Sequence, residues 1–376
     1  MLTQWSSFLA IELGRPMLIS DEDCDAEYPG VLNEEEGTAE VLEPARPSVL
    51  LASIHVSRLL APLARLCRSL CITDDAKRKF ETQLTYCMDL FPKAWQVEGT
   101  GILEPTALEP ITHFQNVRLL LHRHNMSPAN STAQRAVSIA QCALTAQNTA
   151  KIVGRCLVAC EPFDQGREQL RISTTSFICT HLWRCMLFLA FDAQWQHFNT
   201  LLRYSAAIGA SKPINVSCSR HLDLFLHALI ERDQSNPTMA LEEDEDLIVL
   251  LSGDLQAGTN SWVWDTGDSG TALSRGSKQG HSAAVPLPSS PETTPTFSLD
   301  CHLTEEEIQQ WNGWSRIHEM AEWLRKRQEA RWTTGLGEQQ AQLLDQSLRA
   351  TTTSGESSKS FDNTRARMTI ASLTDS

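Results

Sequence analysis

The fold of this chain is decided by the stretch STTSFICTHLWRCMLFLAFDAQWQHFNTLLRYSAAIGASKPINVSCSRHLDLFLHALIER, residues 173–232. It holds three apolar runs, and the apolar residues of each recur at steps of three and four, the spacing of one helix face. The runs are Phe177, Leu182, Trp183, Met186, Leu187 and Ala190; Phe198, Leu201, Leu202 and Ala206; and Leu222, Phe225, Leu226, Leu229 and Ile230. Ile208-Gly209 and Lys212-Pro213 should end the second run. The stretch therefore predicts a buried helical hairpin followed by one more helix.

The same period continues on both sides of this stretch. It predicts helices over residues 49–71, with a kink near Pro62, over 106–124 and 132–160, and a short acidic-to-apolar helix over 239–255. Thr73 should N-cap one further helix, because its hydroxyl can accept from the first turn. The inner face of that helix should carry Phe80, Leu84, Cys87, Met88 and Phe91. No alternating strand pattern of useful length occurs. The sequence thus predicts an all-α fold, with residues 49–255 as one domain without a sheet.

The composition changes after this domain. Gly, Ser, Thr and Pro dominate residues 256–298, and we expect 266–297 to be disordered. Order should return at Thr304, where Thr304 and Glu307 form a capping box, with Leu303 and Ile308 as a hydrophobic staple. The helix that follows, to about residue 331, is predicted to pack back on the domain, or to bind another protomer or a coregulator. Its apolar arc comprises Trp314, Ile317, Met320, Ala321 and Leu324.

The charge of the chain is −14, with 46 Asp and Glu against 32 Lys and Arg. Direct nucleic-acid binding needs a basic surface, so this balance argues against it. Ten acidic residues and no Lys or Arg lie in residues 21–43, and five acids follow one another at 242–246. Such runs are typical of solvated loops, and an activating or partner-binding surface is the alternative.

The 11 cysteines favour a reducing compartment, because most stand among apolar residues, as buried free thiols do. They stand at positions 24, 67, 71, 87, 142, 156, 160, 179, 185, 218 and 301. No two are three apart, so the Cys-x2-Cys loop of a thiolate zinc site is absent from the 376 residues. The most apolar run, 177–193, is interrupted by His181 and Arg184, so we expect no membrane span. The sequons at Asn130 and Asn215 are not expected to be used.

Candidate catalytic and metal-binding patterns were each weighed against a structural role. The acidic run at 21–25 lacks the glycine and the final glutamate of a calcium loop. His113, His122 and His124 are expected to be structural, since His122 and His124 point apart on a helix. Arg15 and Arg123 are expected to pair with the acidic segment. We find no phosphate loop, nucleophile elbow or Cys/His nucleophile arrangement. The sequence therefore predicts no catalytic, cofactor-binding or metal-binding residue, and no enzyme.

Several phrases have an order of Cys, His, Trp and Arg that helix formation alone does not require. The strongest are CTHLWRCMLFLAF (179–191), SAAIG (205–209) with KPINVSCSRHL (212–222), and LFL (224–226). Others are LGRPM (13–17) with DEDCD (21–25) and Tyr28-Pro29, and LLLHRHNMSP (119–128). The last are SGDLQ (252–256) and SWVW (261–264), in a signature from Asp244 to Trp264, and LTEEE (303–307) with Trp311 and Trp314.

In this order, across about residues 5–331, the phrases resemble the all-helical middle homology region of fungal zinc binuclear-cluster transcription factors, in the xylanolytic-activator-like group. The resemblance implies a nuclear protein that modulates RNA polymerase II transcription. Members of the family bind DNA through six N-terminal cysteines that hold two zinc ions, in a Cys-x2-Cys-x6-Cys pattern that occurs twice. This chain lacks that cluster, so we expect neither zinc nor specific duplex DNA to bind it. A fragment, a mispredicted gene or a paralogue that lost its front half would each explain the lack.

The resemblance and the composition together predict four regions. Residues 1–255 are expected to form the helical regulatory domain, N-terminally truncated, and 256–300 a disordered linker. Residues 301–332 are expected to form the C-terminal helix packed on the domain, and 333–376 a mostly disordered tail. The implied partners are other transcription factor protomers, coregulators and a small-molecule effector, with DNA reached only through the missing N-terminal domain and no membrane. The alternatives are an interaction protein that titrates full-length relatives by dimerisation, and an all-α enzyme with a helical pocket.

Overall fold

The computed structural model describes residues 49–127, 130–160, 163–235, 241–252, 311 and 313–331. These residues form α-helices joined by turns and short 3-10 segments, and no strand occurs among them, so the predicted all-α fold is confirmed. The chain divides into two compact units, Met1–Leu324 and Arg325–Ser376. In the second unit, residues 325–331 are helical and Arg325 donates to Glu329 one turn later at 2.6 Å.

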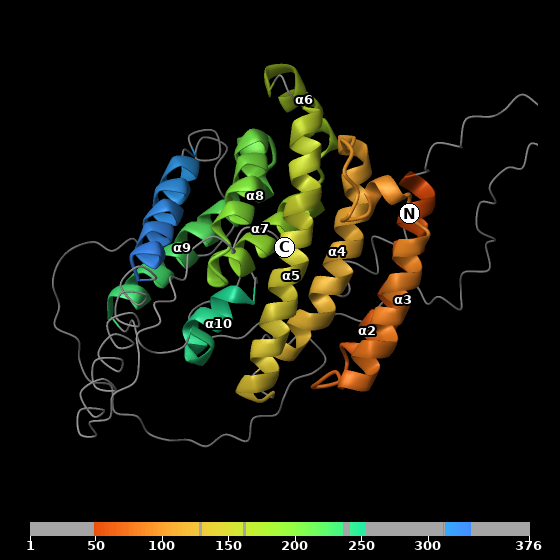
Figure 1. Cartoon of the computed structure of the whole chain (residues 1–376), viewed down its shortest axis with the longest axis horizontal. Helices are drawn as coiled ribbons and strands as arrows, with labels where there is room; N and C mark the ends of the chain where they lie inside the picture. The colour runs from red at the N-terminus through yellow and green to blue at the C-terminus, as the bar shows by residue number, and fades with distance from the viewer. Residues whose placement is uncertain are drawn as a thin grey trace, which may run out of the picture. The chain divides into compact units, whose positions relative to one another are not determined.

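Two helices at the centre of the packing organise the first unit (Figure 1). α5 (Thr132–Ala159) packs on α4 (Leu108–Arg123), α7 (Ser176–Phe191) and α8 (Trp195–Ile208). α7 in turn packs on α8 and on α9 (Pro213–Ser235). On the other side of α4 lie α2 (Val49–Leu66) and α3 (Asp74–Asp89). The short helices α6 (Phe163–Ser173) and α10 (Glu245–Leu251) complete the unit.

Helices α4 and α7 are buried on nearly all sides. In α4 every residue except Glu109 and Arg118 is buried, and in α7 thirteen of sixteen residues are. α7 is apolar on nearly every face, as helices in a protein core are, whereas α4 also buries polar side chains such as Gln115 and Asn116. Residues 173–232, whose pattern decides the fold, therefore form the centre of this unit. Their side chains Trp183, Phe188, Phe198 and Phe225 are fully buried there.

The ends of these helices follow the local chemistry of the sequence. Thr73 accepts from the Ala76 N–H at 3.3 Å and caps α3, as predicted. α8 ends at Gly209, which has φ of 57°, and α9 begins at Pro213. Glycine adopts that conformation at little cost, and proline suits a first helical turn because its missing N–H would be unpaired there. The first helix, predicted to reach residue 71, ends at Leu66, four residues beyond Pro62.

Some features of the fold differ from the predictions or lie outside them. The capping box that starts α5, between Ser131 and Gln134, was not predicted, nor was α6. Two acids of the run 242–246 are not merely solvated: Asp244 caps α10 and pairs with Arg232 at 2.7 Å, and Glu245 pairs with Arg135 at 2.8 Å. The acidic segment 21–43, Arg15, the linker 256–300, the capping box at Thr304 and the tail lie outside the described residues.

The last described helix of the first unit comprises residues 313–324. Ile317, Met320, Ala321 and Leu324 are buried, and Trp314 packs half-buried against the same core. The guanidinium of Arg316 donates to both carboxylate oxygens of Asp223 on α9, through Nε at 2.7 Å and through one terminal nitrogen. These contacts dock the helix on α9 and on the core of the unit.

One described helix, α2, is long and apolar enough to cross a membrane by length and composition. The core helices of soluble proteins pass the same test. Six of its residues are buried, among them Val56, Leu60 and Leu63, and they face α4.

Candidate functional site

His181 of the phrase CTHLWRC is the centre of a buried polar network. Its Nδ1 lies 3.3 Å from Oδ1 of Asn116 on α4, and its Nε2 lies 3.1 Å from Oγ1 of Thr149 on α5. Because an amide oxygen only accepts, Nδ1 carries the ring proton in this arrangement and Nε2 accepts. The phrase therefore positions one side chain that links the three central helices α4, α5 and α7.

The same histidine lies next to a thiol. Sγ of Cys185 is 3.5 Å from Nε2 of His181, four residues earlier on α7. This is a Cys/His contact that the sequence analysis did not find, although i,i+4 spacing on a helix brings side chains together. Both side chains are fully buried, and burial raises the pKa of the Cys185 thiol to about 12. The nucleophilic form of cysteine is the thiolate, so at neutral pH this pair holds a packed thiol.

A second cluster of the phrase surrounds Trp183. The ring of His221 on α9 meets the indole edge-on at 5.0 Å between centroids, and the Arg184 guanidinium lies 5.8 Å from the indole. Burial lowers the pKa of His221 to about 4, so this ring is neutral near pH 7. Neither ring nitrogen of His221 has a hydrogen-bond partner in the described part of the chain. The cluster packs α7 against α9.

His113, His122 and His124, which were considered as metal ligands, each contact a different partner. His113 is buried edge-on against Phe177 at 4.2 Å, and its pKa falls to about 4 through burial. His122 lies 3.0 Å from Glu81 on α3, and His124 lies 2.6 Å from the Ser69 carbonyl oxygen. No group of three metal-ligating side chains occurs among the described residues.

Glu81 joins α3 to α4 through two partners on α4. It accepts from Arg118 at 3.0 Å and contacts His122 at 3.0 Å. Burial raises the pKa of Glu81, but the hydrogen bond with His122 and the Arg118 charge outweigh it, and the pKa lies below its usual value. Arg123, for which pairing with the acidic segment was predicted, is buried at the carboxyl end of α4, where the helix dipole favours a cation.

In two further phrases of the sequence, an asparagine side chain forms hydrogen bonds with the backbone at the end of a helix. Asn125, in LLLHRHNMSP, exchanges two hydrogen bonds with the backbone of Ile72, at 2.8 and 2.9 Å, and fixes the α2–α3 connection to the end of α4. Asn215, in KPINVSCSRHL, donates to the carbonyl oxygens of Ser205 and Gly209, both at 2.9 Å, and closes the end of α8. Asn215 and Asn130, the two sequon asparagines, are both buried.

Arg155 of α5 holds the loop that precedes α4. It donates to the carbonyl oxygens of Gly101 at 2.7 Å and Gln96 at 2.8 Å, and also to that of Ala94. A Cβ on Gly99 would lie 3.0 Å from both terminal nitrogens of this guanidinium, so a larger residue there would require the Arg155 side chain to shift. These partners lie 54 to 61 residues away in sequence, so no local pattern could have revealed them.

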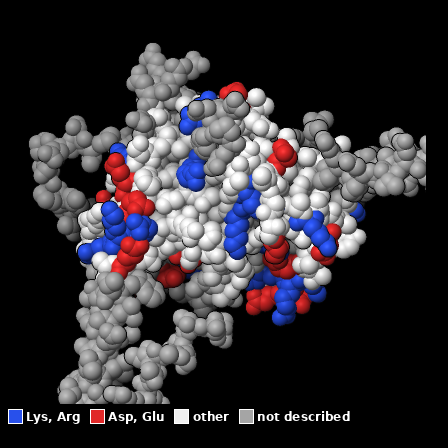
Figure 2. All heavy atoms as spheres, turned by 45° about the horizontal axis from the view of Figure 1, so that its top comes forward, with Lys and Arg blue, Asp and Glu red and all other residues white. Residues whose placement is uncertain are grey.

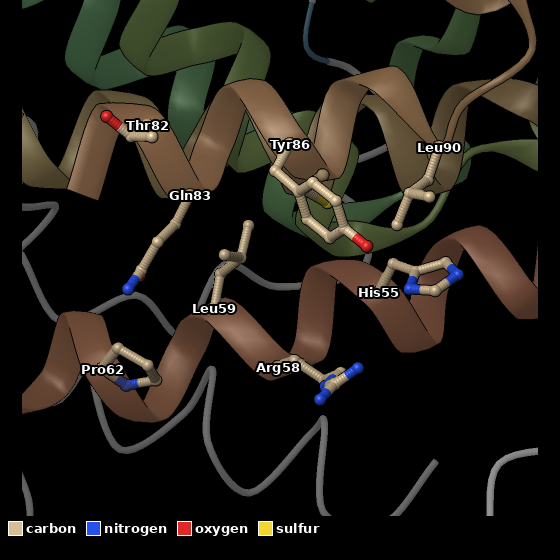
Figure 3. Close-up of a pocket in the computed structure, with 9 residues that line it drawn as sticks. His55, Arg58, Leu59, Pro62, Thr82, Gln83, Tyr86 and Leu90 are labelled. Carbon is tan, nitrogen blue, oxygen red and sulfur yellow. The ribbon is translucent and has the colours of Figure 1, made fainter. Parts of the chain in front are cut away.

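An open groove lies between α2 and α3, with a volume of about 500 Å³. In Figure 3, His55, Arg58, Leu59 and Pro62 of α2 line one side. Thr82, Gln83 and Tyr86 of α3, with Leu90 directly after it, line the other. The side chains of Tyr86 and Leu90 are 68% and 45% exposed. Large apolar side chains in a hollow are typical of a surface that contacts another segment or protein.

The groove lies in a part of the molecule that is not acidic. The described residues hold 24 Lys and Arg against 21 Asp and Glu, a net charge of +3. Since the whole chain carries −14, the residues outside them carry −17. Figure 2 shows acidic and basic side chains next to one another, with a broad uncharged area between the clusters. The excess acid thus belongs to the segments outside the described helices.

No protein-family model, no curated protein and no solved structure matches this chain.

Proposed function

We propose that this chain is the regulatory region of a fungal zinc-cluster transcription factor, and that it modulates RNA polymerase II transcription in the nucleus through protein or effector contacts. The observation that carries the proposal is the ordered series of phrases across residues 5–331. The all-α core supports it, because the phrases at 119–128, 179–191 and 205–222 each supply a side chain whose hydrogen bonds join one part of this core to another.

A tethering experiment tests this function. The chain is fused to an unrelated DNA-binding domain, and transcription of a reporter that carries its site is measured in a fungal host. We expect the fusion to raise or lower the reporter relative to the DNA-binding domain alone. The matched control is the fusion with Leu187→Asp, which places a charge in the buried centre of α7 and should unfold the domain. A folded nuclear fusion that leaves the reporter unchanged would overturn the proposal.

The second candidate, an interaction protein that titrates full-length relatives by dimerisation, is favoured by one face of α5. Ala133, Val137, Ala140 and Leu144 are exposed on it, at steps of four, three and four. Residues 136–150 carry no charge. This is the a/d spacing by which helices of two protomers pair, and small residues allow close approach.

Co-purification of two differently tagged copies, and of this chain with a tagged full-length relative, tests that candidate. Leu144→Glu should abolish the association, whereas Ile172→Glu, at an exposed position on α6, should not. A chain that stays monomeric and captures no relative removes this candidate without touching the first.

A further inference from the structure

We propose that the groove between α2 and α3 binds the chain's own acidic segment, residues 21–43. The inference concerns an intramolecular contact and does not depend on the proposed function.

Charge complementarity is the first argument. Residues 44–73, which include all of α2, contain four Arg and no Asp or Glu. Arg58 stands at the edge of the groove, with His55 one helix turn before it. The segment immediately upstream contains ten acidic residues and no Lys or Arg. An acidic block followed directly by a basic block favours contact between the two, because opposite charges attract across a short separation.

The second argument is the apolar content of both surfaces. The groove is lined largely by apolar side chains. They are Leu59 and Pro62 on α2, and the exposed Tyr86 and Leu90 on the other side. In the segment, Tyr28, Val31 and Leu32 stand just before Glu34, Glu35 and Glu36, with only Asn33 between Leu32 and Glu34. A peptide with an apolar cluster next to acids matches a groove with apolar walls and a basic edge. The groove would cover the apolar residues while Arg58 meets the acids.

The third argument is reach. Glu36 is 13 residues before Val49, the first residue of α2, and an extended chain of that length spans roughly 43 Å at 3.3 Å per residue. Arg58 is nine residues into α2, which is about 14 Å along the helix axis. The segment can therefore turn back along α2 with chain to spare. Being tethered, it competes well with any separate partner, since short linkers give effective concentrations of roughly millimolar.

Photocrosslinking of the full chain tests the contact. The photoreactive residue benzoylphenylalanine replaces Tyr86, which is also aromatic and exposed. The protein is irradiated as a dilute monomer, and the crosslinked peptides are then identified by mass spectrometry. We expect crosslinks to peptides from residues 21–43 in 0.15 M salt, where the Debye length is about 8 Å. Fewer crosslinks should form in 1 M salt, because exposed charges are screened there. The same probe at Val158, exposed on α5, should not reach that segment.

Charge reversal then identifies the ion pairs. Arg58→Glu should lower the crosslinking to residues 21–43 about threefold, the effect of one exposed ion pair. Changing Glu34, Glu35 and Glu36 to Lys in the same protein should restore it. Arg203→Glu, at an exposed position on α8, is the matched control and should change nothing. Arg58 and Arg203 are both exposed to solvent, so neither reversal should unfold the domain. A thermal melt of each variant verifies that it folds.

Three results would overturn the proposal. The first is a Tyr86 probe that never captures residues 21–43, and the second is capture that Arg58→Glu leaves unchanged. The third is a crosslink that joins two copies of the chain and grows with protein concentration, which would assign the groove to a second molecule.

Discussion

At the scale of single residues, the clearest departure from an ideal fold is Ala193, between α7 and α8. It has φ of 55°, and its N–H donates to the Ala190 carbonyl while the next N–H, of Gln194, donates to that of Leu189. This is the helix-ending arrangement that normally carries glycine, because a Cβ is strained in the left-handed region.

Ala193→Gly should therefore stabilise the protein by about 1 kcal/mol. Urea unfolding of the purified chain measures it. The control is Ala140→Gly, at an exposed position inside α5, which should destabilise by about as much since glycine disfavours a helix interior. A loss of stability in both variants would show that residue 193 is not left-handed.

His221 supplies a prediction about pH. Folding lowers its pKa from 6.5 to about 4 through burial, so between these values the unfolded chain binds a proton that the folded chain does not. Its contribution to stability is complete above pH 6.5 and is lost as the pH falls from 6.5 towards 4. His113, whose pKa is also lowered to about 4, acts in the same direction.

His221→Phe should flatten this acid dependence by up to about 1.4 kcal/mol per pH unit, while the new ring keeps the contact with Trp183. Urea unfolding at pH 7, 6, 5 and 4 measures the slope. His318→Phe, at an exposed site on the last described helix, should leave it unchanged. Parallel slopes for the chain and His221→Phe would contradict the burial argument.

At the scale of elements, Arg155 joins α5 to the loop over residues 94–103. Removing the guanidinium leaves three backbone carbonyls without their charged donor, and such hydrogen bonds each contribute roughly 1.5–3 kcal/mol when shielded from water. Because the site is partly exposed, we expect Arg155→Leu to cost about 2 kcal/mol and to speed hydrogen exchange in the loop. Lys151→Leu, exposed one turn earlier, should have little effect. Unchanged exchange in Arg155→Leu would refute this role.

The elements also show what the sequence could and could not predict. The helices predicted over 106–124 and 132–160 lie within two residues of their observed ends, and the Thr73 cap and the stop at Gly209 were also predicted. The helix predicted over 239–255 is shorter and spans Glu245–Leu251, and the one predicted over 49–71 ends at Leu66. α6 was missed because Leu170 is the one buried apolar residue among its described side chains, so no stripe exists. Ser131-x-x-Gln134 is a readable capping signal that was overlooked. The Cys185–His181 contact was also readable from spacing, whereas the bonds of Arg155, Asn125 and Arg316 join residues more than fifty positions apart.

At the scale of the whole molecule, the deletion of residues 300–376 tests whether the last helix stabilises the domain. We expect a lower melting temperature, since burial of side chains such as Ile317 and Met320 is worth roughly 1.5–3 kcal/mol each before ordering costs. Trp314→Ala should act in the same direction, and deletion of 333–376 alone should not. If the longer deletion leaves the melting temperature unchanged and the monomer soluble, the apolar arc is instead a surface for another protomer or a coregulator.

We propose that the chain is a regulatory region, which changes transcription when a DNA-binding domain brings it to a promoter. The most direct measurement places a six-cysteine zinc cluster of known site ahead of Met1 and compares reporter transcription, at equal site occupancy, with that of the cluster alone. We predict that the joined protein changes transcription and that Leu187→Asp abolishes the change. Equal transcription from the cluster alone and from the joined, folded protein would contradict the account.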